Sequence, residues 1–155
     1  MTIRQEAYQL IDHMPEKSVR FIVELIHNMS IEFREKDGSV QDADEIKKEN
    51  ICKLNVIREL PDNWNENGAK AFSRDLTDTV ENILCELEVQ PEIFPTACDS
   101  IQLEFDNSNG DHMEIEITQD ENAEIFLIDK EGKEQFEWIR SEPKIINQRV
   151  KKFYE

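Results

Sequence analysis

Positively charged residues are missing from more than a third of the chain. Between Arg74 and Lys130, 55 consecutive residues contain no Lys or Arg, yet they include 16 acidic residues. Over all 155 residues, 35 acids stand against 18 bases, so the formal net charge is −17. A surface of this sign repels nucleic acid and anionic membranes and attracts cations or basic proteins. We therefore expect a basic protein as partner, with no direct contact to nucleic acid or membrane.

Cysteine and long apolar runs are also scarce. Cys52, Cys85 and Cys98 form an odd set, and their spacings fit neither a disulfide framework nor a zinc site. No run approaches the roughly 18 apolar residues of a membrane span, and the N-terminus lacks a secretory signal pattern. These absences predict reduced thiols and a cytoplasmic location.

Residue patterns typical of enzymes are missing as well. The four glycines are isolated, which excludes a phosphate-binding loop, and the three histidines are scattered over different segments. The loop from Asp106 to Asp111 has the polar character of a calcium loop, but Ile117 occupies the twelfth position, where such loops need a bidentate Glu. An ordinary hairpin turn is the interpretation we favour there, with a weak cation site as the alternative. We expect no metal, no cofactor and no catalytic residue; an enzyme built on the loop around Trp64 is a third-ranked alternative.

Apolar periodicity divides the chain into three parts and predicts an α+β fold. Residues 1–30 have the pattern of an N-terminal helical hairpin, 31–45 that of a linker, and 46–155 that of an α+β domain. In that domain, helices over 44–60 and after Ser73 precede a four-stranded antiparallel meander and a C-terminal helix. The segment between Pro91 and Pro95 is expected to be extended, either an edge strand or a lead-in to the sheet. Asn109-Gly110 predicts a tight hairpin between the first two strands of the meander.

The strands of the meander alternate apolar and acidic residues. Alternation with a period of two places one set of side chains in the core and the other on the outer face. Like charges opposite one another across strands are unfavourable in water, so this face is expected to receive something cationic. The predicted partner-binding residues are Glu104, Glu114, Glu116 and Glu124.

Two further surfaces are open to two interpretations each. In the predicted second helix of the N-terminal hairpin, Phe21 and Leu25 lie off the main apolar stripe, so they pack either against the rest of the chain or against a second copy in a homodimer. In the polar loop after Pro61, Trp64 is either a structural anchor or, with Asn65 and Asn67, part of a recognition pocket.

Two segments resemble known groups of proteins. Residues 4–29, a short helix followed by Met14-Pro15 and an amphipathic helix, resemble the N-terminal segment of antitoxin-like proteins from bacterial type II toxin–antitoxin modules. That resemblance implies an oligomerisation segment and a toxin partner. The chain departs from the pattern because no Arg-rich DNA-contacting segment is present. Residues 64–105 are similar to uncharacterised domains of Gram-positive bacteria and their phages, and this similarity implies no particular activity.

Two functions are consistent with these features. The first is a non-enzymatic acidic protein that binds and neutralises a basic partner, as an antitoxin does. The alternative is an inhibitor from a phage or mobile element that mimics nucleic acid and blocks a bacterial defence protein such as a CRISPR nuclease.

Overall fold

The computed structural model describes residues 11–15, 18–19 and 43–155. The chain divides into two compact units, Met1–Ser39 and Val40–Glu155, and the fold described below is that of the second. Apart from residues 11–15 and 18–19, the predicted N-terminal hairpin, including Phe21 and Leu25, lies outside the described residues, and so does most of the predicted linker.

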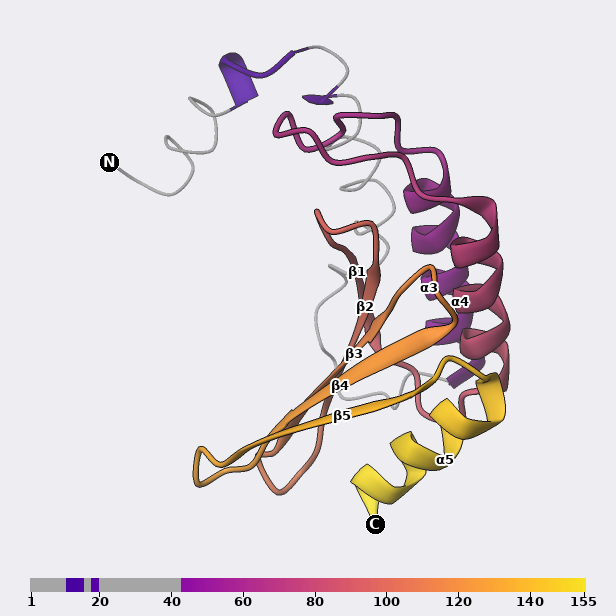
Figure 1. The fold of residues 1–155 in the computed structure, drawn as a ribbon, viewed down its shortest axis with the longest axis vertical. Coiled ribbons are helices and arrows are strands. Elements are labelled where there is room, and N and C mark those ends of the chain that lie inside the picture. Colours follow the sequence, from indigo (N-terminus) through magenta and orange to yellow (C-terminus); the bar gives the residue numbers. More distant parts are fainter. Residues whose placement is uncertain (1–10, 16–17, 20–42) are drawn as a thin grey trace. The chain divides into compact units, whose positions relative to one another are not determined.

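The second unit is an α+β structure built on one antiparallel sheet (Figure 1). The sheet has five strands in sequence order, β1-β2-β3-β4-β5, so each strand pairs with its chain neighbour. In chain order the elements are α3 (Ala43–Arg58), α4 (Arg74–Glu86), β1 (Glu92–Pro95), β2 (Ile101–Asp106), β3 (His112–Ile117), β4 (Asn122–Ile128), β5 (Glu134–Arg140) and α5 (Pro143–Tyr154).

The α+β class and the antiparallel meander are confirmed, whereas the prediction of four strands is wrong. The segment after Pro91 forms a fifth strand, β1, which pairs with β2 so that Ile93 lies opposite Leu103. Helix α3 begins at Ala43 and ends at Arg58, so residues 43–45 are helical instead of being the end of a linker.

The predicted hairpin geometry between β2 and β3 also needs correction. Of the Asn109-Gly110 pair, only Gly110 has positive φ, at 88°. The turn is longer than two residues, because Asn107 N–H donates to Asp111 O and Gly110 N–H donates to Asn107 O, both at 3.1 Å. This is the longer hairpin in which a turn is followed by one residue in the left-handed region, a position that favours glycine.

One face of the sheet forms the hydrophobic core together with the helices. Along β2 and β3 every second residue is buried, and Leu103 and Ile115, which face each other, are fully inaccessible. In Figure 1 helices α3, α4 and α5 follow one side of the sheet. Burying large apolar side chains contributes about 1.5–3 kcal/mol each, which makes this layer the main source of stability. Its largest fully buried members are Phe105, Leu54, Leu76, Ile83, Leu84, Ile101, Leu103, Met113, Ile115, Ile117, Ile125 and Ile146.

Helix α4 begins where the sequence predicts. Ser73 adopts an extended conformation, and its Oγ accepts the N–H of Leu76 at 3.2 Å, which satisfies one of the free donors of the first turn. The apolar stripe of α4, which includes Val80, faces the core, while the acids of the helix lie on its other side.

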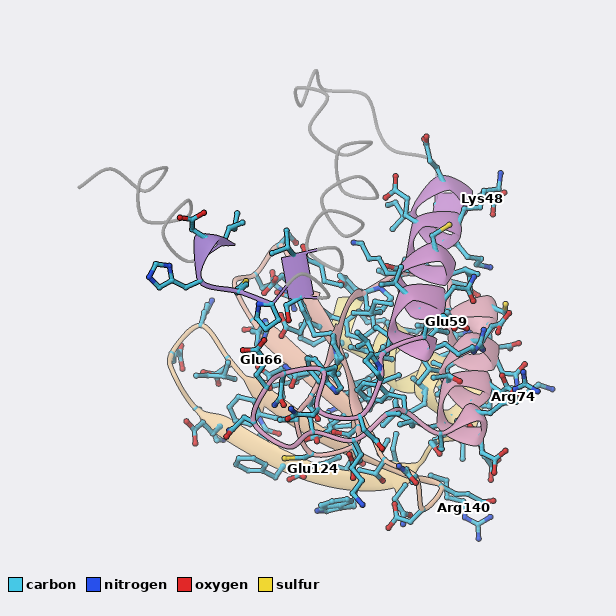
Figure 2. All side chains as sticks on the ribbon, turned by 90° about the horizontal axis from the view of Figure 1, so that it is seen from above. Lys48, Glu59, Glu66, Arg74, Glu124 and Arg140 are labelled. Carbon is cyan, nitrogen blue, oxygen red and sulfur yellow. The ribbon has the colours of Figure 1, made fainter. Side chains whose placement is uncertain are left out.

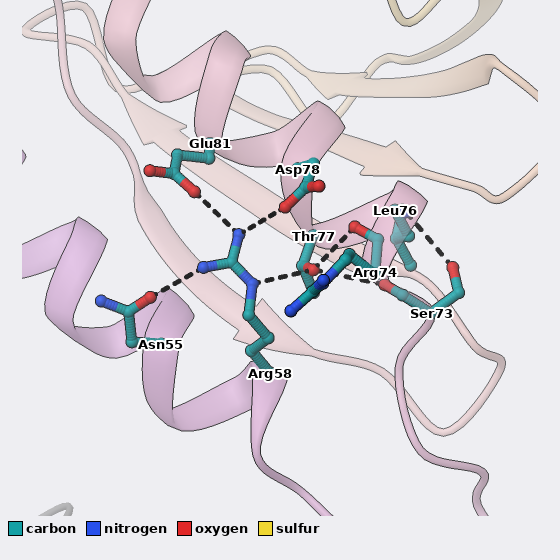
Figure 3. A network of polar contacts seen from close by, with 8 residues as sticks. All are labelled: Asn55, Arg58, Ser73, Arg74, Leu76, Thr77, Asp78 and Glu81. Carbon is teal, nitrogen blue, oxygen red and sulfur yellow. Dashed lines mark hydrogen bonds and ion pairs between the residues drawn. The ribbon is translucent and has the colours of Figure 1, made fainter.

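Arg58 joins α3 to α4 (Figure 3). Its guanidinium group donates to Thr77 Oγ1 at 3.1 Å, Asp78 Oδ1 at 2.9 Å and Glu81 Oε2 at 2.7 Å, and also to Asn55 within α3. Asp78 and Glu81 belong to the 55 residues without Lys or Arg, and both are therefore paired with a base, Arg58, that lies outside that stretch.

Candidate functional site

The face of the sheet opposite the helices is the candidate site, and we call it the outer face. It consists of the side chains that alternate with the buried ones on all five strands. In Figure 2, Glu124 and Arg140 lie along the strands, well away from Lys48 on α3. The central residues of the outer face are Glu92, Phe94, Gln102, Glu104, Glu114, Glu116, Glu124, Phe126, Phe136 and Trp138.

Strand register arranges these residues in two rows that cross the sheet. In both rows carboxylates occupy the middle and aromatic rings occupy the end at β5. The first row runs, from β1 to β5, through Glu92, Glu104, Glu114, Phe126 and Phe136. The second runs through Phe94, Gln102, Glu116, Glu124 and Trp138.

The structure brings together all four predicted partner-binding glutamates. Glu104 lies directly opposite Glu114, and Glu116 lies directly opposite Glu124. Opposite residues of an antiparallel pair have Cβ atoms about 4.5–5.5 Å apart, so like charges at these positions repel each other. All four side chains are partly exposed. The face therefore holds a concentrated negative charge that a cationic partner would neutralise.

Three of the four carboxylates have a hydrogen-bonding neighbour that the sequence did not reveal. Gln102 Nε2 donates to Glu104 Oε1 at 2.8 Å, and Ser100 Oγ donates to Glu116 Oε1. Glu114 Oε1 lies 3.2 Å from His112 Nε2. The side chain of Glu124 has no hydrogen bond or ion pair to another residue in the described part of the chain.

His112 is a basic group in contact with one of these carboxylates. Its Nδ1 lies 2.9 Å from Asp106 Oδ1 and its Nε2 lies 3.2 Å from Glu114 Oε1. Partial burial by itself would lower the pKa of His112, but the two hydrogen-bonded carboxylates outweigh it and raise the pKa above the ordinary value of 6.5. The imidazole therefore offsets part of the acidic charge at this end of the face.

Aromatic side chains form the second half of the site. Phe136 and Trp138 of β5 are 64% and 62% exposed, and Phe94 at the opposite edge is 41% exposed. The ring of Phe126 packs on that of Phe136, with centroids 4.9 Å apart. Large exposed rings next to polar groups are typical of protein-binding surfaces. These rings were not among the predicted site residues, because apolar residues occupy both alternating sets of β5 and the alternation does not show which set faces the core.

In the second predicted site, the loop around Trp64, the side chain of Asn65 is hydrogen-bonded within the loop, whereas Trp64 Nε1 is buried without a hydrogen-bond partner in the described part of the chain. Asn65 Oδ1 accepts the N–H groups of Asn67 and Ala69, both at 3.0 Å. Trp64 packs against Phe72 with ring centroids 5.9 Å apart. These contacts support the interpretation of Trp64 as an anchor, because Asn65 holds the backbone and is not directed at a ligand.

The loop from Asp106 to Asp111 is also held by its own hydrogen bonds. Asp111 accepts from Asn107 Nδ2 and from the N–H of Lys130, both at 3.0 Å. The Asn107 bond and then the Lys130 bond lower the pKa of Asp111. Among the described residues no group of three or more His, Cys, Asp or Glu side chains is arranged to hold a metal ion. Cys52, Cys85 and Cys98 are exposed free thiols.

The unit Val40–Glu155 is therefore a two-layer α+β structure, and none of its described helices covers the sheet face that combines carboxylates with aromatic rings. No protein-family model matches the chain, and comparisons with curated proteins and with solved structures likewise find no match. No helix in the described part of the chain is long and apolar enough to cross a membrane.

Proposed function

We propose that this chain is a non-enzymatic protein that binds a basic partner protein through the outer face and neutralises it, as an antitoxin does. One observation carries the proposal. Two adjacent cross-strand rows place Glu104, Glu114, Glu116 and Glu124 side by side, next to the exposed rings of Phe136 and Trp138.

The two halves of the face have complementary roles in this proposal. The carboxylates attract Lys and Arg side chains, which raises the rate of association and selects partners of positive charge. The rings supply apolar area, since Trp and other aromatic residues at the centre of an interface often contribute 2 kcal/mol or more to binding. Release of repulsion between Glu116 and Glu124 on binding adds to the preference for a cationic surface.

Acid-to-amide substitutions test the proposal. The immobilised chain is used to capture proteins from its native cell, and the affinity of a captured basic protein is then measured over a range of salt concentrations. The test variant replaces four acids of the outer face: Glu104→Gln, Glu114→Gln, Glu116→Gln and Glu124→Gln. The matched control removes the same number of charges from exposed positions elsewhere: Glu45→Gln, Glu59→Gln, Glu86→Gln and Glu155→Gln.

We expect the outer-face variant to bind the basic partner at least tenfold more weakly, while the control variant loses little. Binding of the wild type should weaken as salt rises, because the interaction is between exposed charges. The proposal is wrong if no basic protein is retained at low salt, or if the two variants lose affinity equally.

The alternative function is inhibition of a nucleic-acid-binding defence protein by mimicry. It is favoured by the absence of Lys and Arg from strands β1 to β4, so that a groove built to bind phosphates would meet carboxylates with no Lys or Arg between them on these strands. The two functions differ in one measurement. A mimic competes with DNA or RNA for the captured partner, whereas an antitoxin acting on another part of its toxin leaves nucleic-acid binding unchanged.

A further inference from the structure

Strand β5 is an edge strand of the sheet, and no other described strand pairs with its outer side, which we call the open edge. In the strand order it stands at the end, with β4 as its neighbour. It has seven residues, contains no proline, and six of the seven residues are exposed. Such an edge presents unpaired N–H and C=O groups that can bind another strand.

The hydrogen-bond pattern identifies which residues of β5 point outward. Ser141 N–H donates to Glu121 O at 3.0 Å, and Asp129 N–H donates to Lys133 O at 3.1 Å, at the two ends of the β4–β5 pair. In an antiparallel pair, hydrogen-bonded positions alternate with positions whose backbone groups point away. The odd-numbered residues of β5 therefore bond to β4, and the even-numbered ones, Glu134, Phe136, Trp138 and Arg140, direct their N–H and C=O groups to the open edge.

We propose that two copies of this chain pair through the open edges of β5, antiparallel and related by a twofold axis at Glu137. In this register Glu134 lies opposite Arg140 of the second copy, and Phe136 lies opposite its Trp138. By symmetry each pair occurs twice, and the two sheets join into one.

This register uses every outward backbone group of β5. All four outward residues meet outward residues of the second copy, so each of the four pairs exchanges both hydrogen bonds. Moving the axis to Phe136 or to Trp138 leaves one of the four without a partner within the strand. It also separates Glu134 from Arg140, so the register centred on Glu137 is favoured by the backbone and by the charges.

The side chains on the outer face complement each other in the same register. Glu134 has no ion-pair partner among the described residues, and Arg140 has only the exposed contact to Glu142 at 3.4 Å. Opposite charges and aromatic pairs directly across strands both stabilise an antiparallel pair. The register also places Phe136 and Trp138, the most exposed large hydrophobic side chains of the described residues, beside each other across the two copies on the outer face.

Glu137 is the one residue that meets its own copy. It lies on the inner face, where Arg149 Nε of α5 donates to its Oε2 at 3.0 Å. Each Glu137 thus brings its own counter-ion to the twofold axis, which reduces the repulsion between the two carboxylates.

Charge reversal followed by charge exchange tests this pairing in the full-length chain. The single variants Arg140→Glu and Glu134→Arg each turn two attractive pairs into two repulsive ones. We expect either one to raise the dissociation constant of the dimer about tenfold, measured by sedimentation equilibrium. The double variant Glu134→Arg/Arg140→Glu restores opposite charges at both pairs and should recover the wild-type constant, which a mere loss of folding would not do.

Fluorescence gives an independent readout. The chain has two tryptophans, Trp64 and Trp138, so a Trp64→Phe variant reports on Trp138 alone. Its emission should shift to shorter wavelength as concentration rises through the dimer range, and the shift should be weaker with Arg140→Glu added.

A Phe21→Glu/Leu25→Glu variant distinguishes dimerisation through β5 from dimerisation through the predicted N-terminal contact. Under our proposal this variant still dimerises and Arg140→Glu weakens the dimer. A wild type that stays monomeric at all concentrations would overturn the proposal. So would a dimer that dissociates with Phe21→Glu/Leu25→Glu but is unaffected by both charge reversals, or a double variant that fails to recover.

Discussion

Arg58 Nη2 of α3 donates to Glu81 Oε2 of α4 at 2.7 Å, and the same nitrogen reaches Asp78 Oδ1 at 2.9 Å (Figure 3). The side chain of Arg58 is 22% exposed, so these bonds are partly shielded from water. One guanidinium group therefore offsets the charge of two acids and fixes the packing of the two helices.

Replacing Arg58 with Ala should lower the free energy of unfolding by about 1–2 kcal/mol, because Asp78, Glu81 and Thr77 lose their shared donor. Lys151→Ala is the control, since Lys151 pairs with Glu88 at a site where both side chains are about half exposed or more. Its effect should stay within about 0.5 kcal/mol. Urea unfolding followed by circular dichroism measures both values, and equal losses would contradict the prediction.

Asn107 should be far more important to the β2–β3 hairpin than Asn109. Its Oδ1 accepts the N–H groups of Asn109 and Asp111, and its Nδ2 donates to Asp111 and to the backbone oxygen of Phe153 in α5. We expect Asn107→Ala to cost about 2 kcal/mol of unfolding free energy and Asn109→Ala less than about 0.5 kcal/mol. Thermal unfolding of the two variants provides the comparison, and similar melting temperatures would refute it.

Glu121 occupies a backbone position that favours glycine. Its φ is 60°, in the β3–β4 hairpin, where the other two hairpins have Gly110 and Gly132 at φ 88° and 83°. A residue with a Cβ atom loses about 1–2 kcal/mol of stability when its backbone is left-handed. Glycine avoids this strain but lowers stability by roughly 0.5–1 kcal/mol, because it makes the unfolded chain more flexible. Glu121→Gly should therefore stabilise the fold by up to about 1 kcal/mol, as measured by urea unfolding.

The reverse substitution at Gly132 is the matched control for Glu121. An added Cβ at Gly132 meets no atom within 4 Å, so Gly132→Ala tests backbone conformation without a steric clash. We expect it to destabilise the chain by about 1 kcal/mol. If both substitutions shift stability in the same direction, conformational strain is not the determining factor.

His112 should make stability depend on pH near neutrality. Its pKa is raised in the folded chain, so folding favours the protonated imidazole. This stabilisation is complete below the ordinary pKa of 6.5 and is lost as pH rises through the folded-state value. The difference in unfolding free energy between wild type and His112→Asn should thus shrink as pH rises above the ordinary pKa of 6.5. A difference that stays constant, or grows, would contradict the assignment.

Much of the fold follows from local patterns in the sequence. The alternation of Ile101, Leu103 and Phe105 with polar residues fixes both the strand and its buried face, and Ser73 fixes the start of α4. Strand β1 could not be assigned in this way. Residues next to prolines are extended whether or not they belong to a sheet, and these four form a strand only because they pair with β2.

The hairpins show why a short signal misled the prediction. Asn109-Gly110 has the composition of a two-residue turn, yet the residue that organises the loop is Asn107, three positions before the glycine. Asp129 and Gly132 repeat this spacing, since Asp129 Oδ1 accepts the N–H groups of Glu131 and Lys133. In both loops the side-chain hydrogen bonds determine the length and shape of the turn, and these bonds cannot be predicted from the Asn-Gly dipeptide alone.

The acidic half of the candidate site was predictable, and the aromatic half was not. Glu104 and Glu114 had to share a face once the strands alternate and pair as a hairpin. In β5, apolar residues occupy both alternating sets, Phe136 and Trp138 in one and Ile139 in the other, so the pattern does not say which set is buried. Which set of β5 side chains is exposed depends on the position of the strand at the edge of the sheet, and that position is set by the packing of the whole domain.

The two edges of the sheet differ in a way that limits assembly. Strand β1 has four residues and ends in Pro95, which has no N–H to donate, while β5 is longer and free of proline. A sheet with two receptive edges would add copy after copy and grow into a filament. A sheet with one receptive edge stops when two copies have met, so association through β5 is self-limiting.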